Sequence, residues 1–181
     1  MRLHSIAYLA CVALVLQADD CKVIRGKDLS DPKAPTFSAY RVQKEQVPNP
    51  RLDLSSDVAR MFRTVFSQQT KKGPNYAGHY RVVVWGCGSS CASFAVVNLR
   101  TGRVVDMEYA HSMSGVDFEV EDFLPGTDSE DTSFRYRKDS KLLVVIGAPD
   151  EDAVRGGAFY YLLTGERVKL IHFTPAQKKC H

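Results

Sequence analysis

The stretch from Gly73 to Cys91, GPNYAGHYRVVVWGCGSSC, carries the densest set of structural signals in the chain. It opens with a Gly-Pro-Asn turn and an Ala-Gly pair, and it ends with two cysteines that are four residues apart. The apolar and aromatic run from His79 to Trp85 predicts a β-strand. No standard catalytic or cofactor-binding motif occurs in this stretch or elsewhere in the sequence. The sequence therefore says more about fold and location than about activity.

A single amphipathic helix is expected on the N-terminal side of this stretch. Between Asp53 and Thr70, apolar residues recur with the 3.6-residue period of a helix and share one face. These residues are Val58, Met61, Phe62, Val65 and Phe66. Ser55 or Ser56 supplies an N-cap, and Gly73 matches a C-terminal end. The pattern is typical of a helix that covers one face of a sheet.

Most of the remaining chain is rich in β-branched and aromatic residues and is divided by turn sequences. Strands are expected over 79–85, 93–99, 103–109, 134–137, 141–147, 158–163 and 167–173. The connections at 100–102, 138–140 and 164–166 are too short for crossover helices, so neighbouring strands should run antiparallel. With a further strand over 36–46, the sequence predicts an α+β, mainly β fold. We expect an antiparallel meander of about six to eight strands with one amphipathic helix packed on it.

The N-terminus has the features of a secretory signal peptide. A short basic start is followed by an apolar segment at 6–16 and by the small residue Ala18, just before a pair of aspartates. The apolar segment is shorter than the ~20 residues that a transmembrane helix needs. We therefore expect a signal peptide over 1–18, an extended N-terminal arm over 19–35, and a single secreted domain over 36–181.

The cysteines indicate disulfides. Loss of the signal peptide removes Cys11 and leaves an even number of cysteines, which in an exported chain implies pairing. Three pairings are possible. We favour a bond between Cys21 and Cys180, because they stand at the two ends of the mature chain, and a local bond between Cys87 and Cys91.

The overall charge argues against binding to nucleic acid. The formal net charge is +3, loss of Arg2 with the signal peptide lowers it by one, and no basic stripe stands out. No segment after the signal peptide is apolar enough to span a membrane. We expect a monomer without a cofactor, whose partner is an unknown protein or ligand of the cell envelope.

The pair Cys87 and Cys91 is interpreted as a structural disulfide at the bend between two strands. Redox proteins of the familiar type place two residues between their cysteines, at a helix N-terminus, whereas here three residues intervene after a strand. A zinc site that adds His79 and His111 would need closer ligand pairs, so no metal is expected. The acidic loops at 117–131 and around 150–152 lack calcium-loop spacing and are expected to be solvated and mobile.

A candidate functional patch surrounds the strand before the cysteines. His79 could meet Ser89, Ser90 or Ser93, but no nucleophile elbow accompanies these serines, so no catalytic residue is predicted. Tyr80 and Trp85 complete the patch, because tyrosine and tryptophan dominate binding hot spots.

Four motifs of the chain, together with a helical segment before them, carry a resemblance to a protein group. They are KGPNYAGHY at 72–80, WGCGSSC at 85–91, NLRTG at 98–102 and DSKLLVVIG at 139–147, preceded by DVARMFRT at 57–64. With them the chain resembles a group of small uncharacterised secreted bacterial proteins, which usually have Phe in place of Tyr76 and Asp in place of Asn98. The resemblance implies a periplasmic or secreted protein of a Gram-negative bacterium and brings no established activity with it.

The functional prediction is a non-enzymatic binding or inhibitory module of the cell envelope. It rests on the lack of a catalytic constellation and on a disulfide-held sheet that suits recognition. One alternative is an envelope thiol-redox or hydrolytic enzyme that uses Cys87, Cys91 and His79. Another is a structural accessory subunit of an envelope assembly.

Overall fold

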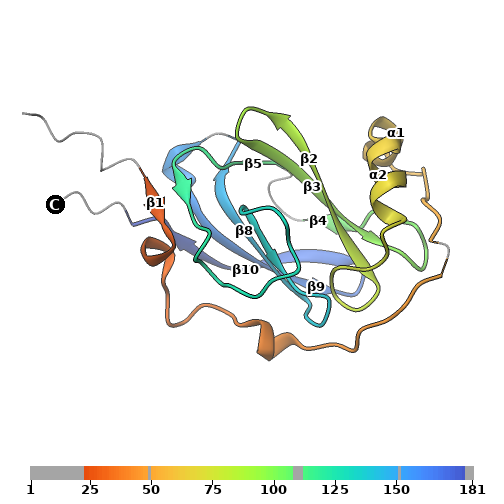
Figure 1. Cartoon of the computed structure of the whole chain (residues 1–181), viewed down its shortest axis with the longest axis horizontal. Coiled ribbons are helices and arrows are strands. Elements are labelled where there is room, and N and C mark those ends of the chain that lie inside the picture. Colours follow the sequence, from red (N-terminus) through yellow and green to blue (C-terminus); the bar gives the residue numbers. More distant parts are fainter. Residues whose placement is uncertain (1–22, 49, 108–111, 151, 178–181) are drawn as a thin grey trace, which may run out of the picture.

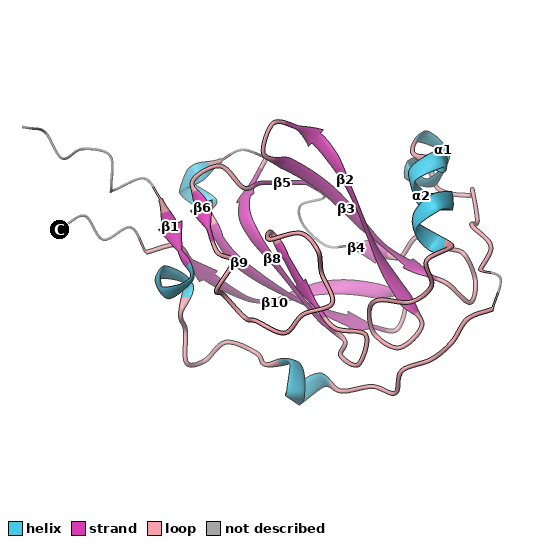
Figure 2. Cartoon of the chain, viewed as in Figure 1, coloured by secondary structure: helices cyan, strands magenta, loops and turns pink. Residues whose placement is uncertain are grey.

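The computed structural model describes residues 23–48, 50–107, 112–150 and 152–177, and it has the mainly β, α+β fold that the sequence predicts. The helices are α1 (Asp57–Met61) and α2 (Arg63–Thr70), with short 3₁₀ turns at Gly26–Leu29, Phe37–Tyr40 and Ala153–Arg155. The strands are β1 (Ile24–Arg25), β2 (Tyr80–Gly88), β3 (Cys91–Asn98), β4 (Asp106–Met107), β5 (Ser112–Ser114), β6 (Phe118–Glu119), β7 (Phe134–Tyr136), β8 (Leu142–Pro149), β9 (Gly157–Thr164) and β10 (Arg167–Pro175). Figure 1 shows α1 and α2 beside β2 and β3, and Figure 2 shows how the strands fill the centre of the molecule.

Eight strands form one sheet, in the order β2-β3-β5-β8-β9-β10-β4 with β7 also paired to β8, while β1 and β6 form a separate pair. The β7–β8 and β9–β10 pairs are antiparallel, as their short connections predict. The second edge of β3 bonds both to β5 and to the segment before β4, where Val105 N donates to Val96 O at 2.8 Å. Because β4 also pairs with β10, the sheet returns to β3 and encloses a core.

This central core receives side chains from every strand of the sheet. Side chains of a strand point alternately to its two faces, so β8, which is buried along its whole length, serves two layers. Leu143 and Val145 point into the central core. Leu142 and Val144 point outwards, where the N-terminal part of the chain covers them.

The outer face of β2 and β3 is covered by the helices, as amphipathicity predicts. Phe66 of α2 and Val83 of β2 are both fully buried in this layer. The single helix expected over 53–70 is instead divided at Phe62, whose φ of −106° and ψ of 30° are not helical. Because of this division, the apolar residues before and after Phe62 no longer lie on one continuous helix face. Met61, which was expected on the buried face, is 75% exposed.

The first part of the segment between β1 and α1, residues 26–40, packs on the other outer face of the sheet, against β8 and β9. Figure 1 shows the whole segment passing along the lower side of the sheet towards the helices. The strand expected over 36–46 does not form. Phe37 and Tyr40 belong to a 3₁₀ turn, in which residues three apart lie on the same side, so both rings can pack on the sheet. An isolated bridge between Arg41 and Ser140, with main-chain hydrogen bonds on either side of it, joins this segment to the turn before β8 without forming a strand.

The strand expected over 103–109 is described only at β4. The turn at 100–102 does bring Val104 antiparallel to Val97, but the chain then leaves β3 and pairs in parallel with β10. The hairpin spacing predicted the turn at 100–102, but it did not predict the pairing of β4 with β10. The expected signal peptide, the Cys21–Cys180 bond and His111 lie outside the described residues.

Candidate functional site

The hairpin of β2 and β3 contains Trp85 and the cysteine pair. Its strands pair from Tyr80 with Asn98 up to Gly86 with Ala92, and a register shift precedes the tip. Cys87 and Cys91 form the expected disulfide at this tip. The bond closes the end of the hairpin, which is where the sequence placed it.

Trp85 lies midway along the hairpin, on the face that the helices cover. The centre of its ring system is 4.8 Å from the ring of Phe62 and 5.4 Å from the ring of Phe66. The break between α1 and α2 falls at Phe62 and thereby brings this ring onto the indole. Trp85 is half-buried, so part of its surface remains available to a ligand.

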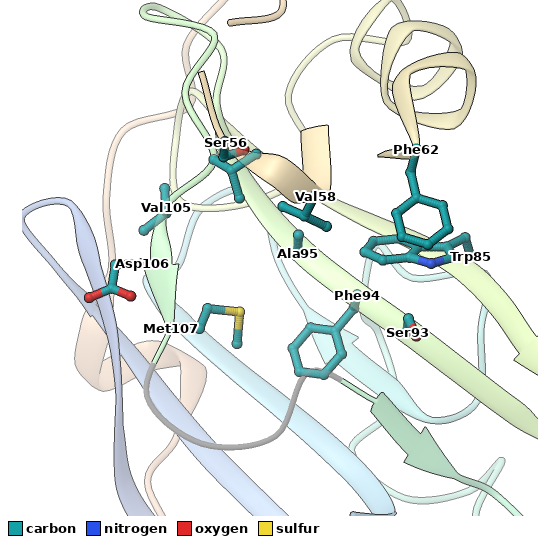
Figure 3. A pocket seen from close by; sticks show the side chains of 11 residues that line it. Ser56, Val58, Phe62, Trp85, Ser93, Phe94, Ala95, Val105, Asp106 and Met107 are labelled. Atoms are coloured by element: carbon teal, nitrogen blue, oxygen red, sulfur yellow. The ribbon is translucent and has the colours of Figure 1, made fainter. Parts of the chain in front are cut away.

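An apolar pocket with a volume of about 600 Å³ opens beside Trp85. It lies where the second edge of β3 has no partner among the described residues, between the residues that pair with β5 and those that pair with the segment before β4. Figure 3 shows Phe62 and Trp85 against each other at one side of the pocket and Val105, Asp106 and Met107 at the other. Small-molecule sites typically have volumes of about 300–1,000 Å³ and mostly apolar walls. The apolar pocket therefore has the size and chemistry of a ligand site.

Three polar residues stand among the apolar ones in this pocket. Ser56 caps α1 by accepting a hydrogen bond from Ala59 N at 3.3 Å. Ser93 comes from β3, and Asp106 pairs with Arg167 at 3.1 Å. A few polar groups in an apolar site fix the orientation of a ligand, whereas the aromatic and aliphatic walls supply most of the contact area.

The predicted patch residues His79 and Tyr80 lie at the opposite end of β2 from the disulfide. His79 Nδ1 is 3.0 Å from Glu45 Oε1, and Glu45 also pairs with Arg100. The hydrogen bond from His79 is the main reason that the pKa of Glu45 lies below its usual range. Tyr80 is buried, which raises the pKa of its hydroxyl, and this hydroxyl lies 3.4 Å from Gly165 O. Both side chains hold neighbouring segments together.

Ser89 and Ser90 lie exposed at the hairpin tip. Ser90 adopts a left-handed φ of 53° and accepts a hydrogen bond from Gly115 N at 2.7 Å through its main-chain oxygen. A strand rises ~3.3 Å per residue, so His79 stands roughly 25 Å from Cys87 along β2. The structure therefore does not unite the predicted patch, and the serines and cysteines do not meet the imidazole of His79.

A second pocket, with a volume of about 630 Å³, lies at the outer edge of β2. We call it the edge pocket. Its walls come from β2, the start of β3, α2 and the acidic loop: Gln69, Lys72, Asn75, Arg81, Val82, Val84, Trp85, Gly86, Cys91, Ala92, Asp128, Ser129, Glu130, Asp131 and Tyr136. Trp85 contributes to both the apolar pocket and the edge pocket.

Arg81 is the unusual residue of the edge pocket. Its side chain is buried, with a relative exposure of 9%, and this burial lowers its pKa. Nη1 donates to Gly73 O at 2.7 Å and Nη2 donates to Gln69 Oε1 at 3.1 Å, while Nε has no partner in the described part of the chain. Both acceptors are neutral, so the positive charge of Arg81 has no direct counterion among the described residues.

Sequence reasoning missed several residues of both pockets. Arg81 was passed over although a charge within the apolar run HYRVVVW is itself a signal of a buried polar site. The Gly-Pro-Asn turn accounts locally for Asn75, and Lys72 directly follows the predicted helix, so neither residue signals a pocket by itself. Phe62 was placed in the core without the Trp85 contact that makes it part of a pocket wall.

Within the ranges that the structure describes, no three His, Cys, Asp or Glu side chains are grouped so as to hold a metal ion. Neither α1, α2 nor any other described helix has the length and apolarity needed to cross a membrane. Comparisons of the chain with models of protein families, with curated proteins and with solved structures gave no match.

Proposed function

We propose that the protein is an exported, non-enzymatic binding or inhibitory module of the cell envelope, and that the apolar pocket holds its ligand. The observation that carries this proposal is the pocket itself. It offers aromatic and aliphatic contact around Trp85, with Ser56, Ser93 and Asp106 as polar groups. The ligand is therefore expected to present an apolar group of a size that fits about 600 Å³.

The surroundings of the pocket support binding. Its walls rest on the hairpin, whose tip is closed by the disulfide, and on the helix that packs on it. A rigid wall lowers the entropy that is lost when a ligand is immobilised. The imidazole of His79, which directly precedes β2, is engaged with Glu45 and lies far from the pocket along the strand.

Trp85 allows a direct test, because it is the only tryptophan in the sequence. Titration with N-phenyl-1-naphthylamine, an uncharged apolar probe, should change the emission of Trp85 and reach saturation. Ser93→Phe places a ring in the pocket and should weaken binding of the probe at least ten-fold. Ser89→Phe adds the same ring at the exposed hairpin tip and serves as the matched control.

Equal probe affinity in the two variants would show that the apolar pocket is not the binding site. Export is tested separately, by expressing the full chain in a Gram-negative bacterium and measuring the N-terminus of the protein from the periplasm. A periplasmic product that begins at Asp19 is expected. Retention of the intact chain in the cytoplasm would overturn the proposed location.

A further inference from the structure

Part of the outer edge of β2 is occupied by the turn that precedes it. In an antiparallel ladder, the main-chain groups of successive residues point alternately towards and away from the partner strand. Tyr80 points away from β3 and exchanges hydrogen bonds of 2.9 and 3.0 Å with Tyr76. Val82 also points away: its N–H donates to Asn75 Oδ1 at 2.8 Å and its carbonyl accepts from Asn75 Nδ2 at 3.2 Å. The side chain of Asn75 thus takes the place of a neighbouring strand at this position.

The next outward-facing positions on β2 are free. By the same alternation, the N–H and C=O groups of Val84 and Gly86 point away from β3, and no described residue hydrogen bonds to them. Val84 and Gly86 both line the edge pocket. The pocket therefore lies along a section of sheet edge that can accept one more strand.

The end of this free section next to Asn75 is positively charged. Arg81 directly precedes Val82, and Lys72 lies in the same pocket wall. A guanidinium carries five N–H groups, and only two of those of Arg81 are directed to described acceptors, neither of them charged. A buried charge is ordinarily paired, and the charge of Glu130 acts on Arg81 without a direct contact that the structure describes. The unused N–H groups can therefore still bind an anion.

The opposite wall of the edge pocket is acidic. Asp128, Glu130 and Asp131 line it, and the first and third already accept main-chain hydrogen bonds from Lys138 and Ser133. The charges of the pocket are therefore divided between a basic end and an acidic side. This division favours a ligand that carries both a negative terminus and a positive side chain.

We propose that the edge pocket binds the C-terminal segment of a polypeptide, which adds to β2 as an antiparallel strand. Such a strand runs from Gly86 towards Val82, so its last residue stops against Asn75 and its carboxylate lies next to Arg81 and Lys72. A parallel strand would bring an N-terminal ammonium to this basic end, where the charges repel. A basic side chain near the end of the partner faces the acidic wall at 128–131. Apart from Trp85, this site shares no lining residue with the apolar pocket, and it does not depend on a ligand there.

The test compares two peptides that differ only at the C-terminus. The probe is an N-acetylated six-residue peptide of alternating lysine and valine that ends in valine, as the free acid or as the amide. The free acid should bind at least ten-fold more tightly than the amide, measured by isothermal titration and by the emission of Trp85. Saturation with the free acid should slow hydrogen exchange of the Val84 and Gly86 amides at least ten-fold, because a new strand hydrogen bonds to them.

Two lysines supply a matched pair of variants. Lys72→Gln, in the edge pocket, should weaken binding of the free acid several-fold, whereas Lys71→Gln, its exposed neighbour outside the pocket, should not. The Ser93→Phe variant should bind the free acid normally, so that failure of this site and failure of the apolar pocket are distinguishable. Equal affinity for acid and amide would overturn the carboxylate site. Unchanged exchange at Val84 and Gly86 would overturn strand addition.

Discussion

The carboxylate of Asp31 lies 2.8 Å from Nε2 of His172 and so joins the N-terminal part of the chain to β10. Thr174 Oγ1 is 3.3 Å from the same carboxylate oxygen. A hydrogen bond from the main-chain N–H of Lys33, followed by the contact with His172, holds the pKa of Asp31 below its usual value. The contact between Asp31 and His172 and the contact between Glu45 and His79 fix the N-terminal part of the chain at two places along the sheet.

Stability should therefore fall in acid. A carboxyl group with a lowered pKa in the folded state stabilises the fold above its unfolded pKa of ~4, and this contribution is lost as the pH falls through the folded value. We expect the free energy of unfolding to decrease between about pH 5 and about pH 2, as measured by urea unfolding. Asp31→Asn should reduce the dependence, although Asp53 and Asp152 also have lowered pKa values and retain their share. An unchanged pH profile in this variant would contradict the prediction.

The contact of Phe66 with Trp85 should be important for stability. Phe66→Ala removes a fully buried ring and is expected to lower the free energy of unfolding by about 3–5 kcal/mol. It should also shift the emission of Trp85 to longer wavelength, because the indole gains contact with water. Met61→Ala, on the exposed side of the neighbouring helix, should change stability by less than about 0.5 kcal/mol. Denaturant unfolding of the two variants makes the comparison.

Arg135 should organise the acidic loop from within. It is buried, burial lowers its pKa, and its guanidinium donates to a group of main-chain carbonyls. They belong to Val120 (2.6 Å), Phe123 (2.7 Å), Thr132 (2.6 Å) and Phe134 (3.0 Å). Arg135→Met removes the guanidinium donor from these carbonyls, of which Val120 O keeps the hydrogen bond from Phe123 N, and should destabilise the protein by at least ~3 kcal/mol.

The control for this variant lies two residues further on. Arg137 is half-exposed and pairs with Asp139 at 3.1 Å, so Arg137→Met should cost at most about 1 kcal/mol. Amide hydrogen exchange over 117–131 should accelerate in the Arg135 variant and not in the Arg137 variant. Similar stability of the two proteins would show that the carbonyl contacts contribute little.

Replacing both Cys87 and Cys91 by serine should have a local effect. The bond closes a very short loop, and the entropic model assigns such a loop about 2 kcal/mol. We expect the variant to fold, with a stability lower by that amount or less and with faster amide exchange at the hairpin tip. Loss of the folded state in this variant would mean that the disulfide does more than close the tip.

Local patterns allowed much of the fold to be predicted. The β2–β3 hairpin combines an apolar run, flexible glycines and a cysteine pair within one short stretch, and the β9–β10 turn has equally local signals. Pairings between distant segments carry no such signal. The parallel contact of β4 with β10 joins residues about 60 positions apart, and nothing in either segment specifies it.

The candidate sites were harder to predict for the same reason. A strand pattern tells which face a side chain occupies, but not which groups from other elements meet it there. Trp85 was identified as a contact residue by its type, whereas its pocket depends on Phe62 and Met107 from two other elements. His79 and Ser89 were grouped because they are close in sequence, and a straight strand then separates them.

The chain covers both outer faces of its own sheet, one with helices and the other with the segment that follows β1. A sheet covered in this way meets another molecule at its rim or where the covers leave a gap. The edge pocket lies at the rim, and the apolar pocket lies beside Trp85, which the helices leave half-exposed. Residues under the covers are then constrained by folding, while residues at the rims are free to vary with the molecule that is recognised. One scaffold of this kind could therefore acquire different ligands without any change to its interior.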